Sequence, residues 1–233
     1  MGSARIRKRV EQVASLFGLG ASLATRAADL DPFEARLVGI ARLAARQPVA
    51  YLLDEPFAGF DARDTADFRA VLHTLHAETG ATVICAMPDE AAAMAMSCRI
   101  GLLSEGRLIQ AGSARALYEE PESVQTARLF GQPPMNIFDR GLIPVTGLPR
   151  GATHVGARGE HLILTPSRVR GRASGDVEAV RQLGADTLLH VRFKEQLFVL
   201  RAGPEDHYRP GDRVSLRLNK PLFFNAEGQR LRK

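Results

Sequence analysis

The sequence is poor in several residue types that particular classes of protein depend on. Its 233 residues include no tryptophan, two cysteines and four lysines. Two cysteines are too few for the disulfide framework of a small secreted domain. No apolar run reaches the ~20 residues of a transmembrane helix, and no apolar signal-peptide segment follows the basic start MGSARIRKRV. We therefore expect a cytoplasmic globular protein.

The scarcity of lysine excludes one kind of site. None of the four lysines follows a glycine, since the preceding residues are Arg7, Phe193, Asn219 and Arg232. A phosphate-binding P-loop requires the dipeptide Gly-Lys, because the lysine reaches the β- and γ-phosphates from a glycine-rich turn. This sequence therefore holds no self-contained P-loop site for nucleotide hydrolysis.

Charge divides the chain unevenly. Residues 1–135 carry 14 basic and 16 acidic side chains, whereas residues 136–233 carry 17 and 10. Between the two parts lies Gly131-Gln132-Pro133-Pro134, where paired prolines end a helix and stiffen the connection. We predict two domains, 1–135 and 136–233.

The first domain alternates helical and strand patterns. Apolar periodicity predicts helices over residues 5–17, 32–46 and 64–79. Short apolar segments predict strands over residues 49–53 and Thr82–Ala86, with a hairpin over 99–111. Buried strands that alternate with helices indicate an α/β layer with a mainly parallel sheet.

The second domain has a different pattern. Short segments of alternating character predict strands over residues 177–183, 187–193, 197–201 and 214–218. The turns between them contain Gly184, Lys194 and Gly211. This pattern is typical of a small β-barrel or sandwich.

Two adjacent carboxylates, Asp54 and Glu55, follow the apolar strand of the first domain. The carboxyl ends of strands are where α/β sheets bind ligands. In a phosphate-hydrolysing site Asp54 would hold Mg²⁺ through water, and Glu55 would orient or deprotonate the attacking water. A bare Asp-Glu pair is more often a solvated strand end, but the neighbouring sequence reverses that preference.

That neighbouring sequence resembles the ATP-binding subunits of ABC transporters. Residues 41–48 are similar to the helix after the family's signature loop, YLLDEP (51–56) to its Walker B strand, and residues 58–62 to its D-loop. GQPPMN (131–136) resembles the exit from the ATPase domain in the sugar and glycerol-phosphate importer branch, and residues 156–162 the opening of that branch's TOBE module. The resemblance implies the C-terminal part of a P-loop NTPase-like ABC ATPase domain (α/β), followed by a small all-β, OB-like TOBE domain.

The resemblance also implies a function. It indicates an ATP-binding subunit that energises sugar-type solute uptake, works with ATP and Mg²⁺, and lies peripherally on the inner face of the cell membrane. Its partners would be a second ATPase subunit and the transporter's membrane subunits. Glu55 would be the general base and Asp54 the Mg²⁺ ligand through water. Asp61 would lie across the dimer from the partner's P-loop, or it would simply cap the following helix.

The sequence departs from the family at its phosphate contacts. The signature motif Leu-Ser-Gly-Gly-Gln falls on Leu30, Asp31, Pro32, Phe33 and Glu34. Asp31 places a carboxylate where the γ-phosphate would lie, Pro32 removes an N–H donor, and Phe33 fills the room that glycine leaves. The same residues predict a helix start with a capping box from Asp31 to Glu34.

A second departure concerns the switch histidine, whose position is taken by Pro88. The family's P-loop would precede the point where this sequence starts, so we expect a fragment of a longer subunit or the product of a shortened gene. Such a chain would be inactive alone and would bind ATP and Mg²⁺ only weakly. Whether the intact subunit hydrolyses ATP stays open.

A non-catalytic alternative is a structural or regulatory partner subunit that uses its TOBE domain for dimerisation or small-ligand binding. Nucleic-acid binding is not expected, because Phe193 and Phe198 fall on strand patterns typical of a core. The arginines of the second domain are also dispersed rather than clustered.

Overall fold

The computed structural model describes residues 3–96, 98–166, 174–184, 186–203 and 206–232. The chain forms two units, Met1–Met96 and Ser97–Lys233. The sequence predicts a boundary after residue 135. In the structure the boundary falls after Met96 instead, so that segment 97–135 belongs to the second unit. The side chain of Arg158 binds backbone carbonyls of this segment, which accounts for its place. As family domains, 1–135 and 136–233 stay a prediction.

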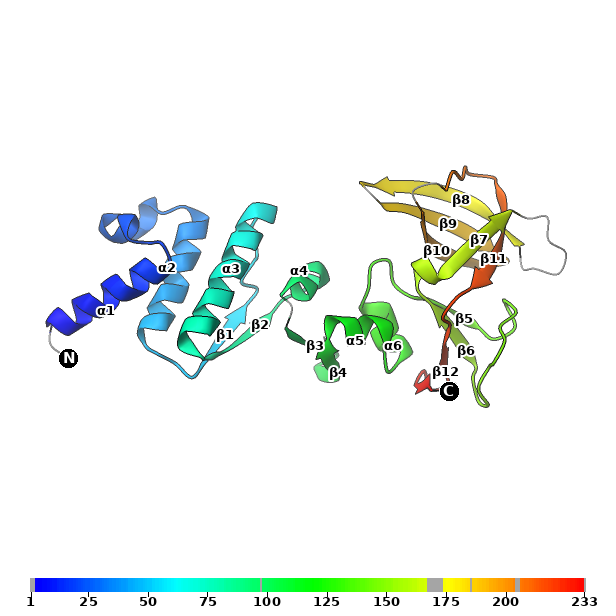
Figure 1. Ribbon diagram of the computed structural model, residues 1–233, viewed down its shortest axis with the longest axis horizontal. Coiled ribbons are helices and arrows are strands. Elements are labelled where there is room, and N and C mark those ends of the chain that lie inside the picture. Colours follow the sequence, from blue (N-terminus) through cyan, green and yellow to red (C-terminus); the bar gives the residue numbers. More distant parts are fainter. Residues whose placement is uncertain (1–2, 97, 167–173, 185, 204–205, 233) are drawn as a thin grey trace. The chain divides into compact units, whose positions relative to one another are not determined.

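The first unit contains helices, two short 3₁₀ turns and two strands (Figure 1). In chain order these are α1 (Ser3–Leu16), η1 (Ala21–Ala24), η2 (Ala27–Asp29), α2 (Pro32–Ala45), β1 (Ala50–Asp54), α3 (Ala62–Thr79), β2 (Thr82–Ala86) and α4 (Glu90–Ala95). The three predicted helices are confirmed within two residues at each end. Gly80 ends α3 because its φ of 65° is strained for any residue with a Cβ.

The two strands of this unit pair in parallel, as predicted, with Ala50 opposite Thr82. One face of the pair is buried against α2 and α3 by Tyr51 and Leu53. On the other face Leu52 and Ile84 lie opposite each other and are 74% and 54% exposed. The expectation of buried strands is therefore wrong for this face, because the described helices cover only one side of the pair.

The exposed apolar face of the β1–β2 pair leads us to expect self-association. Neighbouring apolar side chains beside unpaired strand edges favour contact with another chain. We expect the protein to associate at micromolar concentration and the double variant Leu52→Thr/Ile84→Thr to shift it toward the monomer in light scattering. Leu183→Thr, at a 60% exposed leucine of the other unit, is the control and should change nothing. A monomeric wild type would contradict this prediction.

The core of the first unit is built by α1, α2, α3 and β1. Phe68, Leu72 and Leu75 of α3 are fully buried within it. The ring of Tyr51 is also buried, yet within the described part of the chain its hydroxyl has no hydrogen-bond partner. A buried hydroxyl without a partner retains its desolvation cost.

Tyr51→Phe should therefore leave the free energy of unfolding unchanged or raise it by up to about 1 kcal/mol. The measurement is denaturant unfolding followed by circular dichroism. Tyr51→Ala, the control, should lower the free energy by about 3–5 kcal/mol because it leaves a cavity. A clear loss of stability in Tyr51→Phe would show that a bound water satisfies the hydroxyl.

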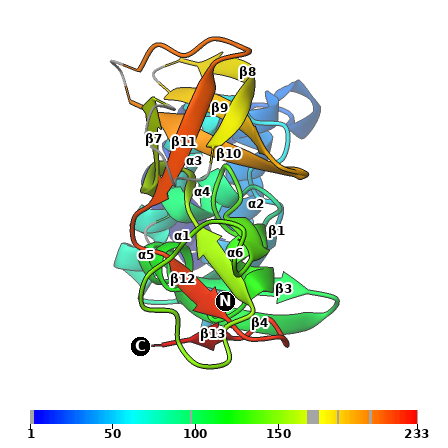
Figure 2. The ribbon, with the colours of Figure 1, turned by 90° about the vertical axis from the view of Figure 1, so that its right-hand side faces the viewer.

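The second unit begins with the predicted hairpin, β3 (Arg99–Ser104) and β4 (Arg107–Ser113), and two short helices, α5 (Ala114–Glu119) and α6 (Val124–Leu129). Two antiparallel sheets follow, of order β13-β12-β6-β5 and β10-β9-β8-β11-β7. Figure 2 shows the second of these as a curled sheet. The strands and one 3₁₀ turn are β5 (Asn136–Asp139), β6 (His154–Ala157), η3 (Gly159–His161), β7 (Leu162–Pro166), β8 (Ser174–Leu183), β9 (Asp186–Phe193), β10 (Gln196–Ala202), β11 (Arg213–Leu218), β12 (Leu222–Phe224) and β13 (Arg230–Leu231).

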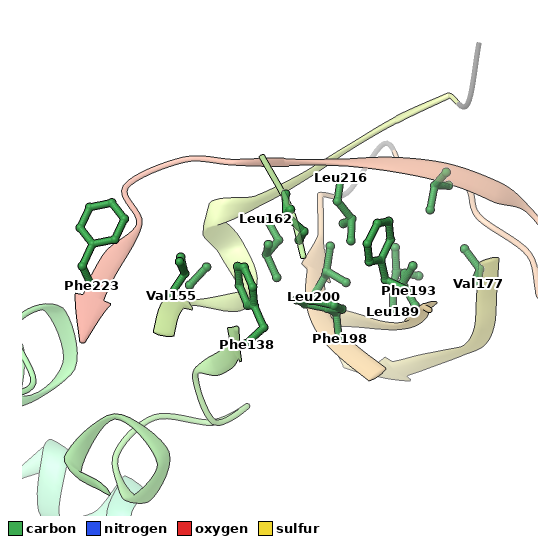
Figure 3. Packing of buried hydrophobic residues seen from close by; sticks show 14 of the residues in the cluster. Phe138, Val155, Leu162, Val177, Leu189, Phe193, Phe198, Leu200, Leu216 and Phe223 are labelled. Carbon is green, nitrogen blue, oxygen red and sulfur yellow. The ribbon is translucent and has the colours of Figure 1, made fainter. Parts of the chain in front are cut away.

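The core of this unit lies between the two sheets and inside the curled one (Figure 3). Phe138 and Phe193 each lie edge-on to Phe198, at centroid distances of 5.3 and 6.3 Å. The expectation that Phe193 and Phe198 are core residues is confirmed. The chain thus has the predicted class, an α/β part followed by a small all-β domain.

Candidate functional site

The two candidate carboxylates lie in solvent at the carboxyl end of β1. Asp54 is the last strand residue, opposite Ala86 of β2, and both Asp54 and Glu55 are exposed. The backbone N–H of Glu55 donates to the Ala86 carbonyl at 2.8 Å, and its φ is 42°. The chain therefore turns sharply after the strand, in a left-handed conformation that costs a residue with a Cβ some free energy.

Arg36 of α2 holds this turn in place. Its guanidinium donates hydrogen bonds to three carbonyls of the turn, those of Glu55, Pro56 and Ala58, at 3.0–3.3 Å. It also lies 5.3 Å from the centre of the Phe60 ring, within the range of a cation–π contact. Arg36 is not predictable from the sequence, since no local pattern marks a side chain whose acceptors lie about twenty residues further along the chain.

The aromatic ring of Phe33 joins the signature segment to the same turn. Its centroid lies 5.5 Å from that of Phe60 and 6.2 Å from that of Phe68. Phe57 and Phe60 also contact the Phe68 ring. We call Phe33, Phe57, Phe60 and Phe68 the aromatic cluster. The predicted signature and D-loop segments are thus brought together, with Phe33 half-buried between them.

Asp31 caps α2, as predicted. Its Oδ1 accepts a hydrogen bond from the Glu34 N–H at 2.7 Å, and Pro32 is the first helical residue. The other half of the predicted capping box differs. The Glu34 carboxylate accepts from the hydroxyl of Ser22, at 2.7 Å, and so ties η1 to α2. Leu30 is half-buried directly before the cap.

Asp61 is the N-cap residue of α3. Its Oδ1 accepts from the Asp64 N–H at 2.8 Å, so the cap that was one alternative for this residue is present. Its role across a dimer stays a prediction. Partial desolvation raises the pKa of Asp64, and the carboxylates of Asp61 and Asp31 add to the effect. The starts of α2 and α3 therefore share a negative potential.

These features test whether the site fits the family's cofactors. A phosphate at a helix start needs free N–H donors and a positive potential. Here the Asp31 carboxylate already uses one amide, Pro32 has no N–H, and Asp61 and Asp64 add negative charge. The start of α2 does not fit a phosphate. Asp54 and Glu55 fit a water-held Mg²⁺ only in part, because the described residues contain no group of three or more metal-ligating side chains.

The segment after β2 lacks a phosphate sensor as well. Pro88 stands at the switch position, and Asp89 caps α4 by accepting hydrogen bonds from Ala91 and Ala92 at 2.8 and 3.2 Å. A proline side chain offers no polar contact to a phosphate, and the Asp89 carboxylate would repel one.

An apolar groove lies between α1, η1 and α2. Its volume is about 160 Å³. Val10 and Leu23 stand exposed along it, at 44% and 52%. The groove is lined by Val10, Val13, Ala14, Leu19, Ser22, Leu23, Val38, Ala41, Arg42 and Ala45. Such exposed apolar surface is typical of a binding site for another protein.

In the second unit, Arg158 is 2% exposed and organises the short helices. Its guanidinium donates to the carbonyls of Tyr118, Ala127 and Phe130 at 2.7–3.2 Å. The Tyr118 ring lies 4.1 Å from the guanidinium carbon, and its hydroxyl donates to Glu160 at 2.7 Å. We call Tyr118, Arg158 and Glu160 the Arg158 clamp.

The contribution of the Arg158 clamp to the free energy of unfolding should depend on pH. Burial, then the hydrogen bond to Glu160, raises the pKa of Tyr118 from the ordinary tyrosine value of 10.0 to about 12. The folded state then keeps a proton that the unfolded chain releases. The stabilisation is complete below pH 10 and is lost as the pH rises toward 12. The stability difference between wild type and Tyr118→Phe, followed by denaturant unfolding, should fall across this window. A constant difference would contradict the shift.

Comparison with known proteins agrees with the resemblance that the sequence motifs indicate. The TOBE domain family matches residues 155–221. The sn-glycerol-3-phosphate import ATP-binding protein UgpC of Salmonella typhi is 30% identical over 99% of this chain and 70% of its own length. The multiple sugar-binding transport ATP-binding protein MsmK of Streptococcus mutans is 30% identical over 95% and 69%.

Among solved structures, cbiO1 of Clostridium perfringens, part of the ABC transporter complex cbiONQ, aligns with a TM-score of 0.49 and 26% identity over 55% of this chain. The chain spans about half of that protein's length, 51%. Among the described residues, no helix has both the length and the apolar character needed to cross a bilayer.

Proposed function

The chain belongs to the family of ATP-binding subunits of ABC importers, and from that premise we propose that it serves solute uptake of the sugar or glycerol-phosphate type as a subunit whose signature segment does not grip ATP. The proposal that the signature segment does not bind ATP rests on one observation, the hydrogen bond from the Glu34 N–H to the Asp31 carboxylate at 2.7 Å. An anion of the chain itself occupies the amide that a phosphate oxygen would need. In the intact transporter, ATP and Mg²⁺ would then be held through other contacts, with Asp54 and Glu55 beside them.

Equilibrium binding of Mg-ATP to the chain tests this proposal. We expect no saturable binding below about 1 mM, because the sequence has no Gly-Lys dipeptide and the Asp31 carboxylate and Pro32 occupy the start of α2, where a phosphate would bind. Fluorescence of a labelled ATP analogue is the measurement, with Asp31→Ser as the comparison variant. Micromolar binding to wild type that is lost in Asp54→Ala would overturn the proposal.

A catalytic subunit and a non-catalytic partner subunit differ in their need for Glu55. The Asp31 cap and Pro88 favour the partner role, in which the second ATPase subunit carries the working site. The test is ATP hydrolysis by the assembled transporter with Glu55→Gln in this chain. Less than a twofold change supports the partner role, whereas a loss of ~10²-fold or more establishes Glu55 as the general base.

The apolar groove is the place we propose for the membrane subunit. Membership of an importer family implies a partner in the membrane, and the groove between α1 and α2 would offer that partner an exposed apolar strip. An amphipathic helix, with apolar side chains at helical spacing, is the form of partner that fills such a strip. The acidic or polar face of that helix would then meet Arg42 at the rim.

Co-purification with the membrane subunits tests the groove. Val10→Glu introduces a charge into the lining and should abolish complex formation. Ile6→Glu is the matched control, because Ile6 lies on the same helix, is 50% exposed and is not part of the lining. Equal recovery of the complex with both variants would place the membrane subunit elsewhere.

A further inference from the structure

A cleft of about 400 Å³ opens at the seam of the curled sheet in the second unit. β7 and β10 are the two edge strands of that sheet, and residues of both line the cleft together with η3. A partly open barrel therefore presents its interior to solvent at this seam. The volume is within the range of small-molecule sites.

The floor of the cleft is apolar. Leu162 of β7, Leu189 of β9 and Leu200 of β10 contribute to it and are 4%, 1% and 1% exposed. These three leucines also belong to the core of the unit, so the floor is rigid and preformed. Because these side chains expose little area to the cleft, a hydrocarbon group there would gain about 25 cal/mol per Å² only over the small apolar area that remains open.

The rim of the cleft carries charge of mainly one sign. Glu160, Arg201 and Asp206 are its charged side chains. The Arg201 guanidinium faces the Asp186 carboxylate at 3.6 Å and donates to the Gln132 carbonyl, so its charge is already balanced. Glu160 and Asp206 accept hydrogen bonds from neutral groups, the Tyr118 hydroxyl and the Gly203 N–H, at 2.7 Å each. Neither of these two donors carries a formal charge, so neither hydrogen bond neutralises its carboxylate.

An apolar floor beneath two carboxylates selects one kind of molecule. We propose that this cleft binds a small amphipathic cation, an ammonium or guanidinium group on a short hydrocarbon body. The hydrocarbon lies on the leucine floor, and the cation donates to Glu160 and Asp206. A charge-assisted hydrogen bond to a carboxylate is about twice as strong as a neutral one.

Binding there reaches the short helices through the Arg158 clamp. Glu160 is the acceptor for the Tyr118 hydroxyl of α5, and the Tyr118 ring lies on Arg158, which holds carbonyls of α5, α6 and Phe130. A cation that takes over the Glu160 oxygen competes with the Tyr118 hydroxyl. A cation bound at Oε1 of Glu160 therefore weakens the hydrogen bond from Tyr118 and loosens the clamp.

The absence of tryptophan allows a direct measurement. Without tryptophan, tyrosine emission can be followed directly, and a carboxylate that accepts the hydrogen bond of a tyrosine hydroxyl quenches that emission. Titration with n-hexylamine should raise the emission along a saturable curve with a Kd of about 1 mM or lower. 1-Hexanol and hexanoate, which share the hydrocarbon but lack the cation, should give no such curve.

Single substitutions separate the binding of the cation from the fluorescence change that reports it. Glu160→Gln and Asp206→Asn should each weaken hexylamine binding about tenfold or more. Tyr118→Phe should remove the fluorescence response while calorimetry still detects binding. No saturable binding of hexylamine to the wild type overturns the proposal. Equal binding of hexylamine to wild type, Glu160→Gln and Asp206→Asn would overturn it as well. The same holds if 1-hexanol binds as tightly as hexylamine.

Discussion

Arg158→Ala is expected to lower the free energy of unfolding of the second unit by about 3–5 kcal/mol. The side chain is 2% exposed and donates four hydrogen bonds to three backbone carbonyls. Removing it leaves carbonyls of Tyr118, Ala127 and Phe130 without this donor in a buried setting, and each such group costs about 1–3 kcal/mol. The cavity left by the long side chain adds to the loss.

Space around the guanidinium is fully used, so the site cannot easily adapt. A Cβ at Gly131, whose φ is 113°, would collide with the Arg158 Nη1 atom. Arg158→Lys should therefore recover only part of the stability, since one ammonium cannot reproduce the planar fork of a guanidinium. We expect its loss to lie between those of wild type and Arg158→Ala.

The measurement is hydrogen exchange followed by mass spectrometry, which reports on α5 and α6 separately from the first unit. Exchange should accelerate across residues 114–130 in Arg158→Ala. The control is Arg213→Ala, because Arg213 is exposed and its 4.0 Å ion pair with Asp176 is worth less than about 1 kcal/mol. Equal protection of residues 114–130 in both variants would mean that Arg158 does not hold these helices.

The elements that were predictable share local signals. The cap at Asp31, Gly80 after α3 and the apolar segment of β2 lie within or next to the elements that they define, so the sequence alone locates them. The parallel pairing of β1 and β2 follows from the helix between them. Periodicity also identified Phe193 and Phe198 as core residues.

The features that were missed depend on residues distant in sequence. Glu34 accepts from Ser22 and not from its own helix start, and Arg36 donates to carbonyls about twenty residues away. Arg158 lies in segment 156–162, which resembles the opening of a TOBE module, but its acceptors lie 28 to 40 residues earlier in the chain. The exposure of Ile84 was not predictable either, because an apolar strand has the same pattern whether one face is covered or two.

The second large effect is expected for Phe68→Ala. Phe68 is fully buried, and its ring contacts those of Phe33, Phe57 and Phe60 at centroid distances of 5.4–6.2 Å. Truncating a buried phenylalanine costs about 3–5 kcal/mol in transfer free energy and cavity formation. The loss falls on the first unit, whose unfolding should shift to lower denaturant concentration.

The same substitution should also loosen the candidate site. Phe33 and Phe60 would each lose a packing partner, which leaves their own contact at 5.5 Å and the hydrogen bonds of Arg36 to join α2 to the turn after β1. We expect faster hydrogen exchange at residues 30–34 and 57–61 than across α1. Phe68→Leu, which keeps most of the volume, should lose less than half as much stability and leave those segments protected. If Phe68→Ala accelerated exchange evenly throughout the first unit, the aromatic cluster would be ordinary core and not the link between the signature segment and the turn.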